Sequence, residues 1–180
     1  MKQLLTLTSL LFFSTVQTPL FAQQDHFIED SIERLENSRK YLLLVAELMP
    51  EEKYDYKATE ESLSFSENLM HIGFALDWHS QSLIGNREAR VYQTDTVFKP
   101  ANKTKAEMMA RIDQTFTEAI ALLQDFEPAQ LEDELDYFGL NRSKRQIFML
   151  LADHITHHRA QMLVSMRLNG LVPPRYVLYQ

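Results

Sequence analysis

Residues 143–170 read SKRQIFMLLADHITHHRAQMLVSMRLNG and give the clearest indication of how this chain folds. Their apolar residues recur at intervals of three and four, which predicts one long amphipathic helix. Ser143 and Gln146 have the spacing of an N-terminal capping box. Asn169 and Gly170, with two prolines shortly beyond, predict the end of this helix.

The predicted buried face of this helix carries polar side chains among its apolar ones. A helical wheel places these residues on one face: Ile147, Leu150, Leu151, His154, His158, Gln161, Met162 and Ser165. A buried polar group without a hydrogen-bond partner costs about 1–3 kcal/mol. The two imidazoles in the middle of the face therefore need partners from elsewhere in the fold.

His154 and His158 make up half of a candidate metal site. Residues at i and i+4 of a helix have Cβ atoms about 5–6 Å apart, so both rings can reach one ion at about 2.0–2.1 Å. The alternative is a pair of buried histidines hydrogen-bonded to each other, to carboxylates or to water. The adjacent Arg159 is expected to pair with an acidic neighbour.

The residues alone leave the third ligand open. The other histidines of the chain are His26, His71, His79 and His157. On the helix predicted around residues 65–84, His79 lies nearer the centre of the apolar face than His71, so the wheel favours His79. His157 lies about 100° around its helix from His158 and is expected to contact a neighbouring helix or solvent.

Three further amphipathic segments precede this helix. They are predicted at Ile28–Met49, at Phe65–Ile84 after a Ser64/Glu67 capping box, and from a Thr104/Glu107 capping box to just before Pro128. Four helices of similar length indicate an all-α four-helix bundle. Between the second and third helices, Asn86–Ala101 has no clear period, and loops of that length are often functional.

Composition excludes several classes of protein. The 180 residues include 18 Lys+Arg against 25 Asp+Glu, a net charge of −7, which argues against a nucleic-acid partner. With no cysteine there is no disulfide, thiolate metal site or cysteine nucleophile. Only 4 glycines and 6 prolines are too few for the many turns of an all-β fold.

The N-terminus is predicted to be a secretory signal peptide, residues 1–22, followed by one domain, residues 23–180. The alternative is an uncleaved anchor. Lys2 is the only charge before Asp25, and an apolar run from Leu4 to Phe13 leads toward Ala22. The run is too short to cross a bilayer, and no comparable segment follows. We therefore expect a periplasmic or secreted protein with no integral membrane segment after the signal is removed.

Several motifs together resemble the DinB-like family. Residues 153–161, DHITHHRAQ, with MRLNG at 166–170 and prolines at 173 and 174, resemble its C-terminal helix signature. Residues 49–59, MPEEKYDYKAT, and 64–72, SFSENLMHI, are similar to its first loop and second helix. The resemblance extends over about residues 27–176. Ala160 stands where a glycine is common in the family.

This resemblance implies an up-down four-helix bundle of the DinB/YfiT type and a divalent metal held by three histidines. Carried over by position, these ligands are His71, His154 and His158, so the resemblance favours His71 where the wheel favours His79. Three neutral imidazoles suit Zn, Ni or Fe better than Mg or Ca, which prefer oxygen ligands.

A three-histidine ion keeps open positions, so we expect a site able to do chemistry. Metal-bound water could attack an ester or amide carbon, or the metal could activate a thiolate. Glu67 and Asp153 are candidates to accept the second N–H of a ligand ring, or else they are solvated or ion-paired. Gln161 is expected to hydrogen-bond a ligand, the metal-bound water or a neighbouring helix.

Three functions remain open at this point. The first is a metal-dependent hydrolase of an unknown small molecule. The second is a thiol S-transferase, as in relatives of the superfamily, against which predicted export counts because such thiols are mainly cytosolic. The third is a non-enzymatic bundle that binds a metal or ligand, or that uses a helix face to form a homodimer.

Overall fold

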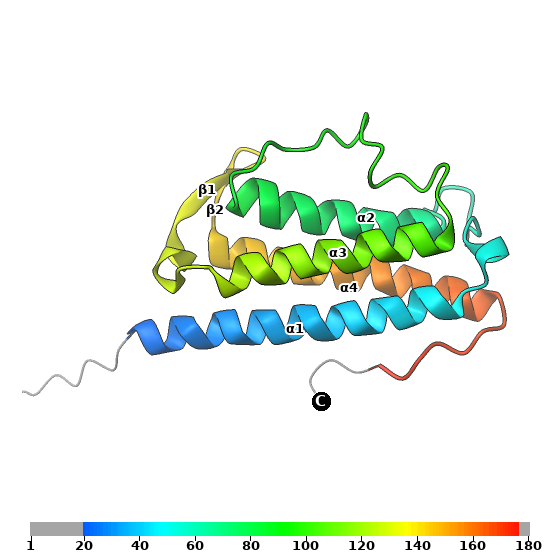
Figure 1. Cartoon of the computed structure of the whole chain (residues 1–180), viewed down its shortest axis with the longest axis horizontal. Coiled ribbons are helices and arrows are strands. Elements are labelled where there is room, and N and C mark those ends of the chain that lie inside the picture. The colour runs from blue at the N-terminus through cyan, green and yellow to red at the C-terminus, as the bar shows by residue number, and fades with distance from the viewer. Residues whose placement is uncertain (1–19, 177–180) are drawn as a thin grey trace, which may run out of the picture.

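The computed structural model of the chain describes residues 20–176, in which four long helices are joined by loops and a β-hairpin (Figure 1). The helices are α1 (Leu20–Leu48), α2 (Phe65–Asp77), α3 (Lys105–Gln124) and α4 (Lys144–Leu168). The predicted start of the first helix at Ile28 is wrong, because α1 already begins at Leu20. Residues 1–19 of the predicted signal peptide lie outside the described residues, so the signal peptide stays a prediction. Between residues 20 and 176, none of the helices combines the length and hydropathy needed to span a bilayer.

Capping boxes begin three of these helices, as their sequences predict. In α2, α3 and α4 the cap hydroxyl accepts a hydrogen bond from the backbone N–H three residues on, and the side chain at that position accepts one from the backbone N–H of the cap. The caps are Ser64, Thr104 and Ser143. Because these contacts are local, short-range sequence signals were enough to place the three helix starts.

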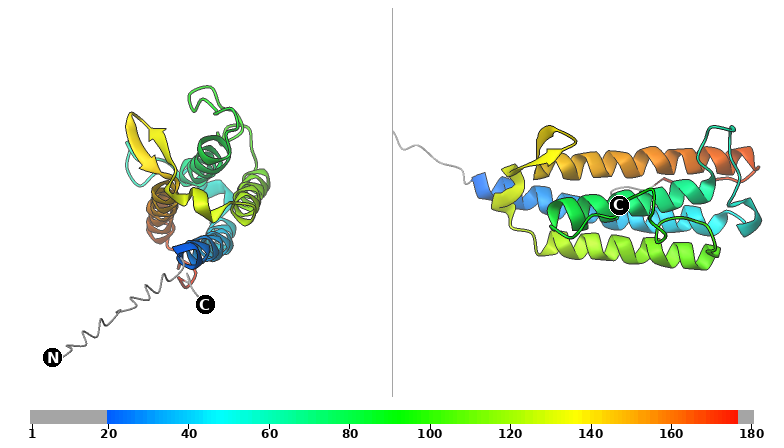
Figure 2. Two further views of the ribbon diagram at one scale, coloured as in Figure 1. Left: turned by 90° about the vertical axis from the view of Figure 1, so that its left-hand side faces the viewer. Right: turned by 90° about the horizontal axis from the view of Figure 1, so that it is seen from above.

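The bundle has a crossover after α2, so its successive helices do not alternate up and down throughout, as expected of an up-down bundle (Figure 1). α1 and α4 run one way, α2 and α3 the other, and the long loop after α2 returns along the bundle to the start of α3 (Figure 1). The contacts agree, since the amide of Gln81, just beyond α2, donates to the Glu118 carbonyl at 3.0 Å, which places the segment after α2 beside the C-terminal half of α3. α1 and α2 each pack against α3 and α4, so α1 and α2 lie diagonally opposite (Figure 2).

The predicted all-α four-helix bundle is confirmed, with one addition. Strands β1 (Glu134–Tyr137) and β2 (Leu140–Ser143) form a short antiparallel hairpin before α4. Its two turn residues are both left-handed, Phe138 with φ 55° and Gly139 with φ 81°. A phenylalanine rarely adopts this conformation, and Phe-Gly is not among the dipeptides typical of two-residue turns. The sequence therefore gave no clear hairpin signal.

α2 is shorter than its predicted span. It ends at Asp77, and Trp78–Ile84 continues it as a π-helix that Gly85 terminates. Ser80 and His79 bond back to the carbonyls of Leu76 and Ala75, at 2.7 and 2.6 Å. The change of period shifts each later side chain around the helix axis, so a regular wheel does not place residues 78–84 correctly.

Arg159 was expected to pair with an acidic neighbour, and this expectation is wrong. Its side chain is only 1% exposed, and its guanidinium lies 5.2 Å from the Tyr41 ring centroid and 5.5 Å from that of Tyr176. No carboxylate contacts it among residues 20–176, and both terminal nitrogens lack a hydrogen-bond partner there. Cation–π contacts, rather than an ion pair, surround this buried charge.

Gly73 lets the crossover loop approach α2 closely. A Cβ atom at this position would lie 2.6 Å from Cδ1 of Ile112 and 2.8 Å from the Phe98 ring. We expect Gly73→Ala to lower the free energy of unfolding by about 1–2 kcal/mol, because overpacking outweighs the gain in helix propensity. Urea unfolding of the two proteins measures this difference.

Ile112→Val provides the matched test, since it removes the closest of these atoms. In the double variant with Gly73→Ala, the loss of stability should be smaller than the sum of the two single losses. Losses that simply add, within about 0.5 kcal/mol, would contradict this account of the packing.

Candidate metal centre

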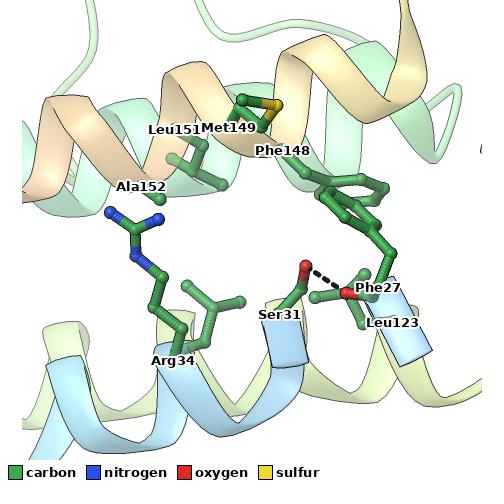
Figure 3. Close-up of a pocket in the computed structure, with 9 residues that line it drawn as sticks. Phe27, Ser31, Arg34, Leu123, Phe148, Met149, Leu151 and Ala152 are labelled. Atoms are coloured by element: carbon green, nitrogen blue, oxygen red, sulfur yellow. Dashed lines mark hydrogen bonds between the residues drawn. The ribbon is translucent and has the colours of Figure 1, made fainter. Parts of the chain in front are cut away.

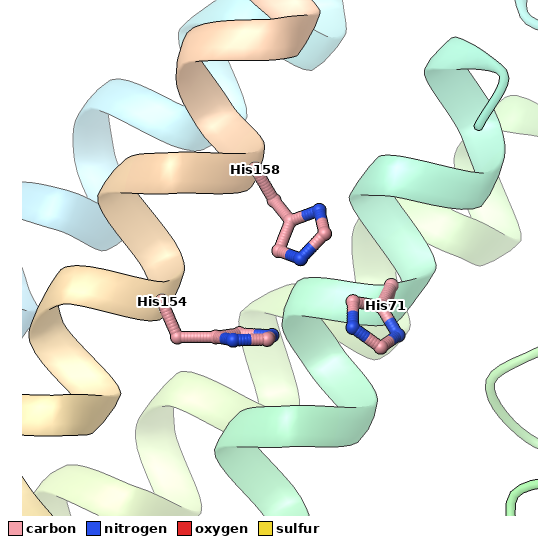
Figure 4. Close-up of side chains that lie close together, drawn as sticks. All are labelled: His71, His154 and His158. Atoms are coloured by element: carbon pink, nitrogen blue, oxygen red, sulfur yellow. The ribbon is translucent and has the colours of Figure 1, made fainter. Parts of the chain in front are cut away.

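Three histidines converge between α2 and α4. His71 comes from the middle of α2, and His154 and His158 come from successive turns of α4 (Figure 4). The ring centroids are 5.0 Å apart for His71 and His154 and 4.5 Å apart for each of the other two pairs. One candidate ligand nitrogen from each ring lies within 4.8 Å of the others. Nitrogens that share one ion at about 2.0–2.1 Å lie at most about 4 Å apart, so small side-chain rotations would complete a site.

Two of these rings have buried nitrogens that no group in the described part of the chain satisfies. His71 Nδ1 and His154 Nε2 have no hydrogen-bond partner among residues 20–176. Leaving a buried polar atom unpaired costs about 1–3 kcal/mol. An ion that accepts the lone pairs of these nitrogens would remove that cost, so the residues present fit a divalent metal.

Asn68 orients the third ring. Its amide nitrogen donates to the carbonyls of Leu63 and Ser64 at 3.1 and 2.9 Å, so its Oδ1 faces His158 Nδ1 at 2.9 Å. Because a carboxamide oxygen only accepts, Nδ1 of His158 carries the proton and Nε2 presents its lone pair. Asn68 thus fixes the tautomer and the ring angle that ligation requires.

The polar residues predicted to support the ligands are engaged elsewhere. Glu67 closes the capping box of α2 and lies 3.4 Å from the Lys57 ammonium. Asp153 is exposed and lies 3.7 Å from Arg34. Gln161 hydrogen-bonds His157, the exposed histidine on its own helix, at 2.9 Å. The ion-paired interpretation of both carboxylates is therefore the correct one.

The remaining candidates for the third position lie outside the group. His79 is buried, donates from Nδ1 to the Ala75 carbonyl at 2.6 Å and accepts from the Tyr137 hydroxyl at 3.1 Å. His26 pairs with Glu29 on the surface. The wheel favoured His79 because it finds the centre of the apolar face. The three rings instead meet at the margin of that face, where α2 borders α4 and His71 is half-buried.

The whole described bundle also matches a known family. The DinB family matches residues 23–179. The chain belongs to the DinB family. A relative found by sequence is the uncharacterized protein YjoA of Bacillus subtilis (strain 168), 27% identical over 130 residues, which are 70% of this chain and 80% of YjoA.

Solved structures of DinB-like proteins share the fold. A DinB-like protein from Bacillus cereus ATCC 10987 has a TM-score of 0.68 at 21% identity, covering 85% of this chain and 97% of that one. YjoA of Bacillus subtilis has a TM-score of 0.65 at 18% identity, covering 83% and 99%. YfiT of Bacillus subtilis, described as a probable metal-dependent hydrolase with an unusual four-helix bundle topology, has a TM-score of 0.60 at 17% identity, covering 86% and 92%.

A pocket between α1, α3 and α4 is separate from the histidines of this DinB-family chain. It is lined mainly by apolar side chains, including Phe27, Leu123 and Phe148, with Arg34 at one side (Figure 3). Its volume of about 50 Å³ is far below the roughly 300–1,000 Å³ of typical small-molecule sites. We do not assign it a functional role.

Burial keeps the three converging histidines of this DinB-family chain neutral. Desolvation, helped by the neighbouring histidines, lowers the pKa of His154 to about 4 and that of His158 to about 3. The pKa of His71 is also lowered, first by burial and then by the charge of Lys99. Neutral imidazoles are the form that binds metal, so the site needs no deprotonation at neutral pH.

We expect acid to destabilise the metal-free protein. The pKa values of His154 and His158 are depressed from the ordinary 6.5, so the unfolded chain binds more protons than the folded one below that pH. The free energy of unfolding should be highest above pH 6.5 and should fall as the pH drops toward 4. Urea unfolding in EDTA between pH 7.5 and 5 measures this slope.

The pH slope should become shallower in His154→Gln and should persist in the surface variant His157→Ala. A free energy of unfolding that is the same at pH 7 and pH 5 would contradict the burial of neutral imidazoles.

Proposed function

We propose that this protein is a metal-dependent hydrolase of a small molecule. The observation that carries the proposal is the convergence of three neutral imidazoles, two with orphaned buried nitrogens, on one margin of the bundle. YfiT, which shares the fold, is described as a probable metal-dependent hydrolase, and this description supports the same chemistry here.

The residues of the histidine cluster and Asn68 have distinct roles in this proposal. His71, His154 and His158 would hold the ion, and Asn68 would keep His158 in the tautomer that binds it. A divalent ion on three imidazoles supplies a Lewis acid and lowers the pKa of water to near neutrality. All ligands are neutral, so the ion would keep its full charge to polarise an ester or amide carbonyl.

The test is hydrolysis that depends on the metal and on its ligands. Protein purified without an affinity tag is stripped with EDTA, reloaded with Zn²⁺, Ni²⁺ or Fe²⁺, and assayed against chromogenic esters and amides. We expect turnover only in the reloaded wild type and in His157→Ala. If His154→Ala turns over the substrates as fast as wild type does, hydrolysis at this site is ruled out.

We also propose that the protein is exported, on the basis of the predicted signal peptide at residues 1–22. N-terminal sequencing of the protein recovered from cell envelope and culture medium tests this. A mature chain starting near Gln23 is the expected result, and an intact cytosolic chain would contradict it.

A further inference from the structure

Lys99 is a cation beside the histidine cluster, and no carboxylate of the described residues pairs with it. Its ammonium lies 3.5 Å from the centroid of the Tyr92 ring, and that ring stands edge-on to His71 with centroids 5.5 Å apart. One tyrosine ring therefore separates the charge from a candidate ligand. Within residues 20–176, no Asp or Glu lies within ion-pairing distance of this ammonium.

Carboxylates that could offset this charge are committed to other partners. Glu67, one turn from His71, pairs with Lys57, and Asp153, next to His154, pairs with Arg34. No carboxylate raises the pKa of any of the three histidines. Although the protein as a whole is acidic, the ammonium of Lys99 therefore gives this site a positive charge, and a bound divalent ion would add to it.

The crossover loop that carries Lys99 is held in place against α2. Buried Asp77 of α2 pairs with Arg87 and with Arg90, and Arg90 also pairs with Asp95. Asp95 accepts the Phe98 backbone N–H at 2.6 Å.

Phe98, the residue before Lys99, anchors this part of the loop. Its side chain is buried against Gly73 of α2, and Lys103 donates to the carbonyl of Lys99 at 2.7 Å. The position of Lys99 is therefore set by the fold before any ligand binds, which reduces the entropic cost of using it.

We propose that Lys99 is a specificity residue that selects substrates carrying a carboxylate or phosphate group near the bond to be cleaved. This inference rests on the proposed metal-dependent function. Lys99 receives the anionic group, and the Tyr92 ring between it and His71 offers an apolar surface to the part of the substrate that joins the anion to the metal.

The test compares two hydroxamates of equal chain length, one ending in a methyl group and one in a carboxylate. Their binding to Co²⁺-loaded protein is followed by the visible spectrum of the ion. In wild type the carboxylate probe should bind more tightly. In Lys99→Met the ratio of the two affinities should fall about five- to tenfold, and Lys99→Arg should retain it.

Lys40→Met is the matched control, because it removes the same charge from an exposed position on α1, diagonally opposite α2. It should leave the affinity ratio unchanged. A ratio that stays the same in Lys99→Met, with both probes still bound, overturns the role of Lys99 and leaves the proposed function intact. If wild type does not bind Co²⁺, or if neither probe changes the visible spectrum of bound Co²⁺, both the role of Lys99 and the proposed metal-dependent function are overturned.

Discussion

His154→Ala should weaken binding of a divalent transition metal by at least about 100-fold. The variant removes one of three imidazoles and leaves two donors, one on each helix, which cannot complete the site. Metal content of the purified protein and calorimetric titration with Zn²⁺ and Ni²⁺ measure the loss. Unfolding provides a second readout, because metal at 100 times its dissociation constant should stabilise wild type by about 2.7 kcal/mol.

His157→Ala is the control for this experiment. His157 is a neighbour of His158 on the same helix, but it is exposed and hydrogen-bonds Gln161. The His157→Ala variant should bind metal as wild type does and show the same metal-dependent stabilisation. Equal affinity in His154→Ala and wild type would show that the three rings do not share an ion.

Asn68→Ala should weaken metal binding by about 10- to 100-fold although Asn68 is not a ligand. It removes the acceptor that holds the proton of His158 on Nδ1, and with it the control of ring angle and tautomer. The same variant leaves the Leu63 and Ser64 carbonyls without the amide donor of Asn68, so it should also lower stability by about 1–3 kcal/mol.

Asn68→Asp separates these two effects. An aspartate keeps an acceptor for His158 but loses the donors to the two carbonyls. We therefore expect metal affinity within a few-fold of wild type, together with a loss of stability in the metal-free protein. If Asn68→Asp loses as much affinity as Asn68→Ala, the asparagine acts through the packing of α2 rather than through the His158 ring.

The helical part of the fold was predictable because its signals are local. A capping box, an apolar period or a terminal glycine acts over a few residues, so each could be recognised without knowledge of the neighbours. Two local features were not predicted, because they depart from the regular geometry that sequence patterns assume. The π-helix at Trp78–Ile84 and the left-handed Phe138 break regular periods and turn rules that sequence patterns assume.

The spacing of residues predicted only the part of the candidate site that lies on α4. The i, i+4 spacing of His154 and His158 indicated two convergent rings, and only the family resemblance indicated His71 over His79. Asn68 carried no signal of its own, because an asparagine in the first turn of a helix is as often a solvated residue. Its role depends on a contact with a residue 90 positions away.

The amino-acid sequence by itself determined the four amphipathic helices, the starts of α2, α3 and α4, and the paired histidines of α4, since these depend on contacts within one helix. Only the tertiary structure decided which α2 residues meet α4, which way α3 runs after the crossover, and that Lys99 lies beside His71. These features depend on side-chain packing between distant segments, where burial and close contact, rather than local periodicity, set the lower free energy.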